Sequence, residues 1–198
     1  YLQSSYIDKW AGFPLYQNTQ TKYYSCGEEM FPDMLEALRG AKHFIFLEYF
    51  IIEEGYMFNT ILDILEEKAK AGVDVRFIYD DVGSINSISF GYYKKLQERG
   101  IPCVTSNPFK PLISVVMNNR DHRKIFVVDG YIGFTGGINL ADEYINKVKR
   151  FGYWKDTGVR IEGEAVWSLT AMFLEMWNYI NRSTEDYSRF LPSVYREK

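Results

Sequence analysis

The sequence predicts an α/β domain, because apolar runs of strand length alternate along it with segments of helical periodicity. Glycine stands at the end of several helical segments, where a helix has to stop. The chain has 198 residues, of which 46% are hydrophobic. A single domain of this size buries about 70% of the surface that its unfolded chain exposes. A substantial hydrophobic core is therefore expected to hold the domain together without a disulfide scaffold.

Helical periodicity marks four segments. Residues 28–40 place Met30, Met34 and Leu38 four residues apart, on one face of a helix that ends at Gly40. The same reasoning predicts three more helices, at 57–71, 87–99 and 164–181. The apolar stripe of the last helix is typical of a core-facing surface.

Strand-like runs separate these helices. Most are apolar at successive positions, as in strands of a sheet that is covered on both faces. The predicted strands are 43–52, 73–81, 101–105, 124–128, 131–135 and 155–161. Residues 1–25 are expected to form an irregular arm, ahead of a single domain that spans 26–198.

Composition limits the classes of function. The formal net charge is -3 and the sequence pI is about 5.5. This net charge disfavours a protein whose main ligand is a polyanion, since nonspecific nucleic-acid binders usually carry an excess of basic residues. Arg120, Arg123 and Lys124 could still form a local basic patch. The two cysteines, Cys26 and Cys103, are too few and too far apart for an extracellular disulfide framework.

The most informative stretch is residues 122–139, HRKIFVVDGYIGFTGGIN. His122 and Lys124 are two residues apart at the start of a predicted strand, so their polar groups share a face. Gly136 and Gly137 let backbone N–H groups approach an anion without a Cβ in the way, and Asn139 adds an amide donor. Together these groups suit a phosphate that is attacked, held and charge-stabilised.

The same stretch resembles the signature of the phospholipase D superfamily: His, any, Lys, any four, Asp, any six, Gly, Gly, any, Asn. Wider motifs are similar to the phospholipase D-type cardiolipin synthases of bacteria. They are LEYFIIEEG at 47–55, IYDDVGS at 78–84, NNRDHRK at 118–124, TGGINLADEY at 135–144 and FGYWKDTGVRIEG at 151–163. The resemblance runs from about Tyr16 onward and implies a phospholipase D-like domain, with a mixed sheet flanked by helices. Gly137 departs from the many superfamily members that carry Ser there.

The resemblance implies a mechanism. His122 would attack a phosphodiester and form a covalent phosphohistidine, while Lys124 and Asn139, with Gly136 and Gly137, would hold the non-bridging oxygens. The expected activity joins two phosphatidylglycerol molecules into cardiolipin, with this chain supplying the N-terminal half of the active site. The other half would come from a second phospholipase D-like domain in the same polypeptide or from a homodimer partner.

An acid should orient the imidazole through its second nitrogen. Asp129 belongs to the catalytic signature, but it lies seven residues from His122, roughly 23 Å along an extended strand. This geometry favours a structural role for Asp129, closing the strand turn or pairing with a base. Asp156, in the WKD tripeptide, matches the position at which the family supplies the orienting acid, and it is assigned that role. The other histidine, His43, has no partner motif and is interpreted as structural.

Two further acids are second-tier site candidates. Glu48 lies inside an apolar strand, so it is expected to pair with a base or to face the cleft. It also matches an acid common in the cardiolipin synthase branch, and Glu143 belongs to the TGGINLADEY motif. No metal and no cofactor are expected, because no second histidine or cysteine stands at ligand spacing from His122 and the neighbouring lysine would repel a cation.

Other functions use the same residues. Water in place of the acceptor alcohol would give phospholipase D hydrolysis. A homodimeric phosphodiesterase that cuts phospholipid or nucleic acid is the main alternative. A third is a noncatalytic domain that keeps the motif only as a relic. The acidic net charge and the motifs shared with cardiolipin synthases favour the phosphatidyltransferase, with no nucleic acid as a partner.

A membrane surface is the expected setting. The family resemblance implies a full-length protein at the cytoplasmic side of the cell membrane, with this chain as a soluble fragment of it. The longest apolar candidate for a membrane span, around 43–52, is interrupted by Glu48. Residues 107–124 combine an apolar stretch with basic flanks, which fits either an interfacial lipid-entry loop or a buried strand.

Overall fold

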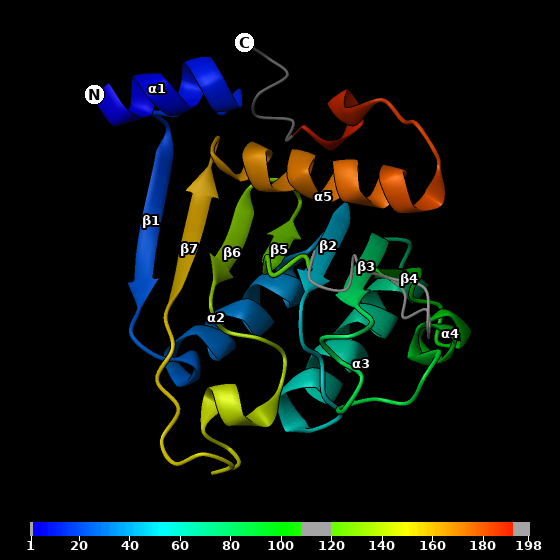
Figure 1. Ribbon diagram of the computed structural model, residues 1–198. Helices are drawn as coiled ribbons and strands as arrows, with labels where there is room; N and C mark the ends of the chain where they lie inside the picture. The colour runs from blue at the N-terminus through cyan, green and yellow to red at the C-terminus, as the bar shows by residue number, and fades with distance from the viewer. Residues whose placement is uncertain (1, 108–119, 192–198) are drawn as a thin grey trace.

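The protein is built around one mixed β-sheet, as the computed structural model of residues 2–107 and 120–191 shows (Figure 1). Its strands are β1 Thr19–Tyr24, β2 Phe44–Tyr49, β3 Asp74–Asp80, β4 Cys103–Ser106, β5 Ile125–Val128, β6 Ile132–Gly136 and β7 Gly158–Gly163. Their order in the sheet is β1-β7-β6-β5-β2-β3-β4. β2 is parallel to β3 and β3 to β4, whereas the other neighbours are antiparallel.

Helices cover both faces of this sheet. The helices are α1 Leu2–Ala11, α2 Gly27–Gly40, α3 Tyr56–Lys70, α4 Tyr92–Glu98 and α5 Val166–Asn181. In Figure 1, α5 crosses one face, while α2 and α3 lie behind the other. The predicted α/β class, with a mixed sheet flanked by helices, is confirmed. No helix among residues 2–107 and 120–191 combines the length and apolar character needed to cross a membrane.

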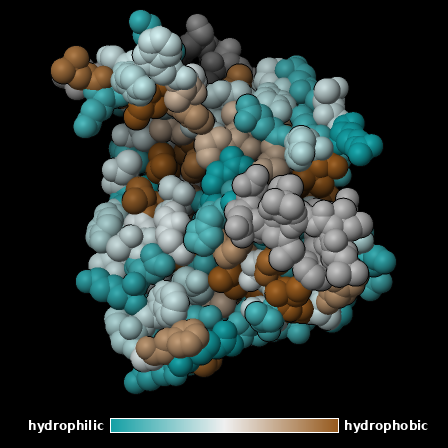
Figure 2. All heavy atoms as spheres, in the orientation of Figure 1, coloured by the Kyte–Doolittle hydropathy of each residue, from teal (hydrophilic) through white to brown (hydrophobic). Residues whose placement is uncertain are grey.

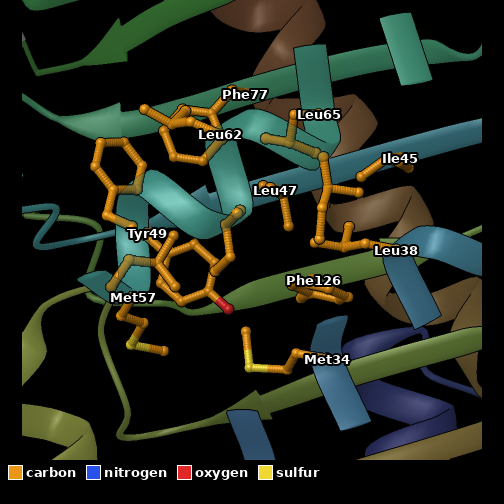
Figure 3. Packing of buried hydrophobic residues seen from close by; sticks show 14 of the residues in the cluster. Met34, Leu38, Ile45, Leu47, Tyr49, Met57, Leu62, Leu65, Phe77 and Phe126 are labelled. Carbon is orange, nitrogen blue, oxygen red and sulfur yellow. The ribbon is translucent and has the colours of Figure 1, made fainter. Parts of the chain in front are cut away.

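Two hydrophobic cores follow from the alternation of side chains along the strands. On the face covered by α2 and α3, Ile45, Leu47 and Phe126 of the sheet pack with Leu38 and Leu62 of the helices (Figure 3). The next residues along β2 point to the other face. There the ring of Phe46 stacks on Phe173 of α5 with centroids 4.6 Å apart. The odd and even positions of β2 therefore serve different cores.

The N-terminal region differs from the sequence prediction. The irregular arm expected for 1–25 is wrong over most of its described length, because 2–11 form α1 and 19–24 form β1. Four of the six β1 residues are exposed, so this edge strand has no apolar run for a sequence pattern to reveal. α1 buries none of its residues, and hydrophobic side chains reach the surface at this corner (Figure 2).

One helix boundary was also wrong. A helix was expected over 87–99, but α4 begins only at Tyr92. Gly91, just before it, has φ of 75°, in the left-handed region that a right-handed helix cannot pass through. Residues 87–91 of the expected helix lie instead in turns and irregular chain.

Asp129 stands in the tight turn between β5 and β6. Asp129 and Gly130 have φ of 52° and 65°, as the central residues of a type I′ turn require. The carboxylate accepts backbone N–H groups from Lys42 at 2.9 Å, His43 at 2.7 Å and Phe44 at 2.9 Å. Asp129 thus fastens the start of β2 to the end of β5, at the end of β5 farther from His122.

Asp129→Asn is expected to lower stability more than activity. The amide keeps one acceptor oxygen but turns an NH2 group toward a backbone donor, which should cost about 1–3 kcal/mol. The midpoint of thermal unfolding should fall by about 2–4 °C per kcal/mol. Asp8→Asn, on the exposed helix α1, is the matched control and should leave the midpoint unchanged. A large loss of kcat at an unchanged midpoint would contradict the structural role.

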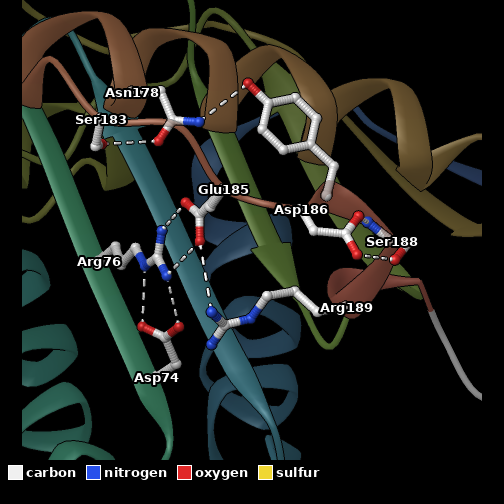
Figure 4. Close-up of polar contacts among 9 residues, drawn as sticks. Asp74, Arg76, Asn178, Ser183, Glu185, Asp186, Ser188 and Arg189 are labelled. Atoms are coloured by element: carbon white, nitrogen blue, oxygen red, sulfur yellow. Dashed lines mark hydrogen bonds and ion pairs between the residues drawn. The ribbon is translucent and has the colours of Figure 1, made fainter.

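An arginine network holds the chain after α5 against the sheet (Figure 4). Arg76 of β3 donates to Asp74 at 2.9 and 3.0 Å and to Glu185 at 2.6 and 3.2 Å. Its guanidinium carbon lies 5.2 Å from the Phe46 ring centroid and 5.1 Å from that of Phe190. The charge is therefore paired twice and stacked, as a buried arginine requires.

Candidate active site

The predicted site residues meet at one edge of the sheet, the edge toward which the arrows of β2, β3 and β6 point in Figure 1. His122 and Lys124 immediately precede β5, and Asn139 follows β6. Asp156 lies two residues before β7, whose Gly158 pairs with Gly136 of β6. Antiparallel pairing of β5, β6 and β7 thus gathers residues that are up to 34 positions apart in the sequence.

His122 and Lys124 form the centre of the site. The Lys124 Nζ lies 2.9 Å from the Nδ1 of His122 and donates to the His122 carbonyl at 2.7 Å. The His122 side chain is exposed, whereas Lys124 is buried beneath it with 3% of its surface accessible. The imidazole is therefore open to solvent, and the ammonium lies directly behind it.

Phe50, which follows β2, forms a wall of the site. Its ring centroid is 4.4 Å from that of His122, at an interplanar angle of 47°. The Lys124 Nζ lies 5.5 Å from the same ring. Sequence reasoning missed this residue as a site component, although it stands inside the quoted LEYFIIEEG motif and directly follows a strand end.

The electrostatics suit a neutral nucleophile beside a cation. Partial burial and the charge of Lys124 lower the pKa of His122, against the opposing charges of Asp121 and Asp80. Burial lowers the pKa of Lys124 to about 8, although the charges of Asp156 and Asp121 act to raise it. At neutral pH the imidazole is therefore mainly uncharged and the amine mainly protonated.

Asn139 is buried and fixed at both ends of its amide. Its Oδ1 accepts from the backbone N–H of Ile51 at 3.1 Å, and its Nδ2 donates to the hydroxyl of Tyr144 at 2.8 Å. An amide nitrogen carries two protons, so one donor is left after the bond to Tyr144. The role of that second donor as a phosphate contact stays a prediction.

The two glycines serve close packing. A Cβ on Gly137 would lie 2.0 Å from the Asp156 Oδ1, and one on Gly136 would lie 2.4 Å from the carbonyl oxygen of Thr157. The backbone N–H of Gly137 donates to that carbonyl at 3.0 Å. The expectation that Gly137 offers a bare N–H to phosphate is therefore corrected, because β7 approaches closely enough to use it. The Asp156 carboxylate fills the space that a serine side chain would need.

Asp156 lies beside Gly137, with its Oδ1 accepting from the backbone N–H of Thr157 at 2.8 Å. Its charge acts on Lys124, where it opposes the effect of burial on the amine pKa. Asp156 and His122 are both in the described part of the chain, and no hydrogen bond joins them. The role of Asp156 as the acid that orients His122 stays a prediction.

The second-tier acids occupy different surroundings. Glu48 of β2 is buried, and its Oε1 lies 3.2 Å from an Nη of Arg123, so this acid stands beside a base, as the sequence predicted. Glu143, in the 3₁₀ turn Asp142–Ile145, is 3.3 Å from an Nη of Arg150. The cations near the site are also compensated, since Arg123 pairs with Asp121 as well.

Within residues 2–107 and 120–191, no three His, Cys, Asp or Glu side chains are grouped as a metal-ligand set. The part of the expected lipid-entry segment that covers 108–119 lies outside the described residues.

Comparison with known families identifies the domain. Residues 34–177 match the family model described as cardiolipin synthase, PLD-like domain. The chain belongs to this phospholipase D-like family. The recognition made from the His122–Asn139 signature is thereby confirmed.

Related sequences agree with this assignment. The phospholipase D-like domain is 44% identical over 167 residues to a cardiolipin synthase of Alkalihalophilus pseudofirmus, covering 84% of this chain and 33% of that protein. It is 47% identical over 197 residues to an uncharacterized protein of Streptococcus mutans, covering all of this chain and 42% of that protein. The chain thus spans less than half the length of these relatives.

Solved structures share the fold of the phospholipase D-like domain. NucT from Helicobacter pylori superposes with a TM-score of 0.62 at 12% identity, covering 81% of this chain and 96% of that one. Nuc from Salmonella typhimurium, a phospholipase D family member, gives 0.58 at 21% identity over 81% and 93% of the two chains. At these identities the likeness concerns the fold alone.

Proposed function

We propose that this domain is one catalytic half of a cardiolipin synthase, which transfers a phosphatidyl group between two phosphatidylglycerol molecules. The observation that carries the proposal is the buried Lys124 ammonium, 2.9 Å from the exposed imidazole of His122, within the family signature. Identity of about 44% to a cardiolipin synthase over most of the chain supports this substrate class. The activity of the whole protein is inferred, because the relatives are more than twice as long.

The first step forms a phosphohistidine. His122 attacks the phosphorus of one phosphatidylglycerol, a P–N bond forms, and the P–O bond to the terminal glycerol breaks. The departing glycerol takes a proton from a general acid. Lys124 and the remaining amide donor of Asn139 stabilise the charge on the non-bridging oxygens.

The second step releases cardiolipin. The free hydroxyl of another phosphatidylglycerol gives its proton to a base and attacks the phosphorus, so that a P–O bond forms and the P–N bond breaks. Because the incoming and leaving groups are both alcohols, the reaction needs no oxidant and no external energy source.

The Lys124 contact has to change during attack. When the Lys124 ammonium donates to Nδ1 of His122, the ring proton is on Nε2. In that tautomer Nε2 has no free lone pair and cannot attack phosphorus. Phosphate oxygens offer the ammonium stronger acceptors than a neutral imidazole does. Substrate binding therefore draws Lys124 away from Nδ1, and the ring proton can move there while Nε2 attacks.

The direct test uses the full-length protein with phosphatidylglycerol vesicles and mass spectrometry. Cardiolipin and glycerol should appear in equal amounts. If phosphatidic acid were the main product, the protein would be a hydrolase and the proposed transferase activity would be wrong. Cleavage of DNA without any lipid turnover would favour the phosphodiesterase alternative instead.

The pH dependence of kcat/KM should be bell-shaped. His122 attacks only when neutral, and its pKa lies below the usual 6.5, so activity should fall only in acid below about pH 6.5. Lys124 holds phosphate only when protonated, so activity should fall again as pH rises through about 8. Lys124→Arg should move the alkaline limb upward, because arginine stays charged. An alkaline limb that does not move in this variant would contradict the assignment.

A further inference from the structure

One buried acid near the nucleophile has no part in the mechanism above. Glu48, near the end of β2, is only 3% exposed. Neither of its carboxylate oxygens accepts a hydrogen bond of good geometry from the described residues. Leaving a buried carboxylate without donors is costly, so this group needs a physical explanation.

The nearest polar groups are the two neighbours of His122 in sequence. The Oε1 of Glu48 lies 3.2 Å from an Nη of Arg123. Arg123 in turn grips Asp121: its Nε is 2.9 and 3.0 Å from the two carboxylate oxygens, its Nη2 contacts the second of them, and its backbone N–H donates to Asp121 at 3.0 Å. Glu48, Arg123 and Asp121 form one cluster, called here the Glu48 clamp.

Apolar groups otherwise surround Glu48. Its strand partners are Ile78 on β3 and Ile125 on β5. The titratable side chains of α5, which covers this face, are Glu175 and Tyr179, and both are exposed. Among the described residues, the charges that act on Glu48 are those of the other two clamp residues.

This environment keeps Glu48 protonated. Burial, followed by the hydrogen bond and charge of Asp121, raises the pKa of Glu48 to about 9, against the opposing charge of Arg123. Burial also acts to raise the pKa of Asp121, but hydrogen bonds with Arg123 and Glu48 lower it overall. Glu48 is therefore the neutral partner and Asp121 the ionised one. The proton on Glu48 can be shared with the Asp121 carboxylate, which explains how a buried acid is tolerated here.

The clamp lies where the backbone is not part of a helix or strand. Residues 120–124 have no regular secondary structure, and β5 begins only at Ile125. His122 stands between Asp121 and Arg123 in this segment, and its side chain contacts Phe50 and Lys124 instead. Holding both neighbours to β2 fixes the backbone from which the imidazole projects.

We infer that Glu48 is a positioning residue for His122: its buried carboxyl holds Arg123, and through it Asp121, against β2, so that the nucleophile between them is kept in line with the phosphate. The effect of Glu48 on turnover rests on the proposed function, whereas its effect on the position of His122 does not. A displacement of about 1 Å in a nucleophile can cost two orders of magnitude in rate.

The test compares Glu48→Gln with Glu48→Leu in the full-length protein. Glutamine keeps one donor and one acceptor and should retain kcat within about threefold of wild type. Leucine fills the site but lacks both groups, and it should lower kcat by about 10- to 100-fold with KM changed less than threefold. Its melting temperature should stay equal or rise, because an apolar side chain suits the buried site.

A second readout is independent of lipid turnover. Acylation of His122 by diethyl pyrocarbonate, followed on its peptide by mass spectrometry, should change in rate in Glu48→Leu and match wild type in Glu48→Gln. If wild type makes no cardiolipin but this difference persists, the proposed function fails and the clamp stands. Glu185→Gln, which breaks an arginine pair at the far end of the sheet, is the matched control: it should lower the melting temperature and leave kcat unchanged.

Asp121→Asn breaks the clamp from a less buried position and should give the same loss of kcat, even if Glu48→Leu does not fold. Wild-type kcat and His122 reactivity in a folded Glu48→Leu would overturn the inference. So would a Glu48→Gln protein that is folded and as impaired as Glu48→Leu, since that result would require an ionised carboxylate.

Discussion

Replacing His122 by alanine is expected to abolish phosphatidyl transfer, with a loss in kcat of about 10⁴-fold or more. The imidazole is the nucleophile of the proposed mechanism, and the described residues around it offer no second one in its place. Lys124 is mainly protonated at neutral pH, so its amine has no free lone pair with which to attack. A covalent intermediate cannot form without a group that attacks phosphorus.

Trapping the intermediate tests this expectation directly. Rapid acid-free quenching of the wild-type reaction, followed by mass spectrometry, should show a phosphatidyl mass shift on the peptide that contains His122. His43→Ala is the matched control, because the structure uses only the backbone of His43 near Asp129. Near-normal turnover in His122→Ala, or an adduct on another residue, would rule out the assignment.

Residues 1–198 alone are expected to be almost inactive. The nucleophile and the leaving glycerol lie on opposite sides of the phosphorus, so the acid that protonates glycerol has to face His122 across the substrate. The chain has two histidines, and His43 lies at the start of β2, at the opposite end of that strand from Phe50 and His122. A second phospholipase D-like motif would supply the acid.

A concentration series separates the possible sources of that second motif. The 198-residue chain and the full-length protein are assayed side by side, with the oligomeric state followed by light scattering. High activity in the full-length protein alone places the motif in the same polypeptide. Activity of the short chain that rises with dimer formation would favour a homodimeric enzyme. Strong activity from a monomer of the short chain would contradict the two-motif mechanism.

The sequence predicts most clearly where local pattern and burial agree. The apolar run before Asp129 becomes β5, and the Asp-Gly pair after it forms the turn to β6. The spacing of two residues also predicts that His122 and Lys124 lie together, and their side chains do touch, although β5 begins only at Ile125. These features depend on neighbours in the chain, which a sequence displays directly.

Other features depend on contacts between distant segments. Glu48 reads as an acid inside an apolar strand, but its partners follow only from the pairing of β2 with β5. The use of the Gly137 N–H by Thr157 likewise needs the approach of β7. The edge strand β1 shows little in its sequence because it gains its order from hydrogen bonds to β7.

The antiparallel pair β2–β5 is held at both ends, by Asp129 at one and by the Glu48–Arg123 contact at the other. Both strands are also paired on each side, unlike β1 and β4 at the margins of the sheet. Local opening in a protein starts from its least supported segments. The edge strands β1 and β4 should therefore open locally more often than the segment that carries His122. Fraying at the edges of the sheet then leaves the position of the nucleophile unchanged.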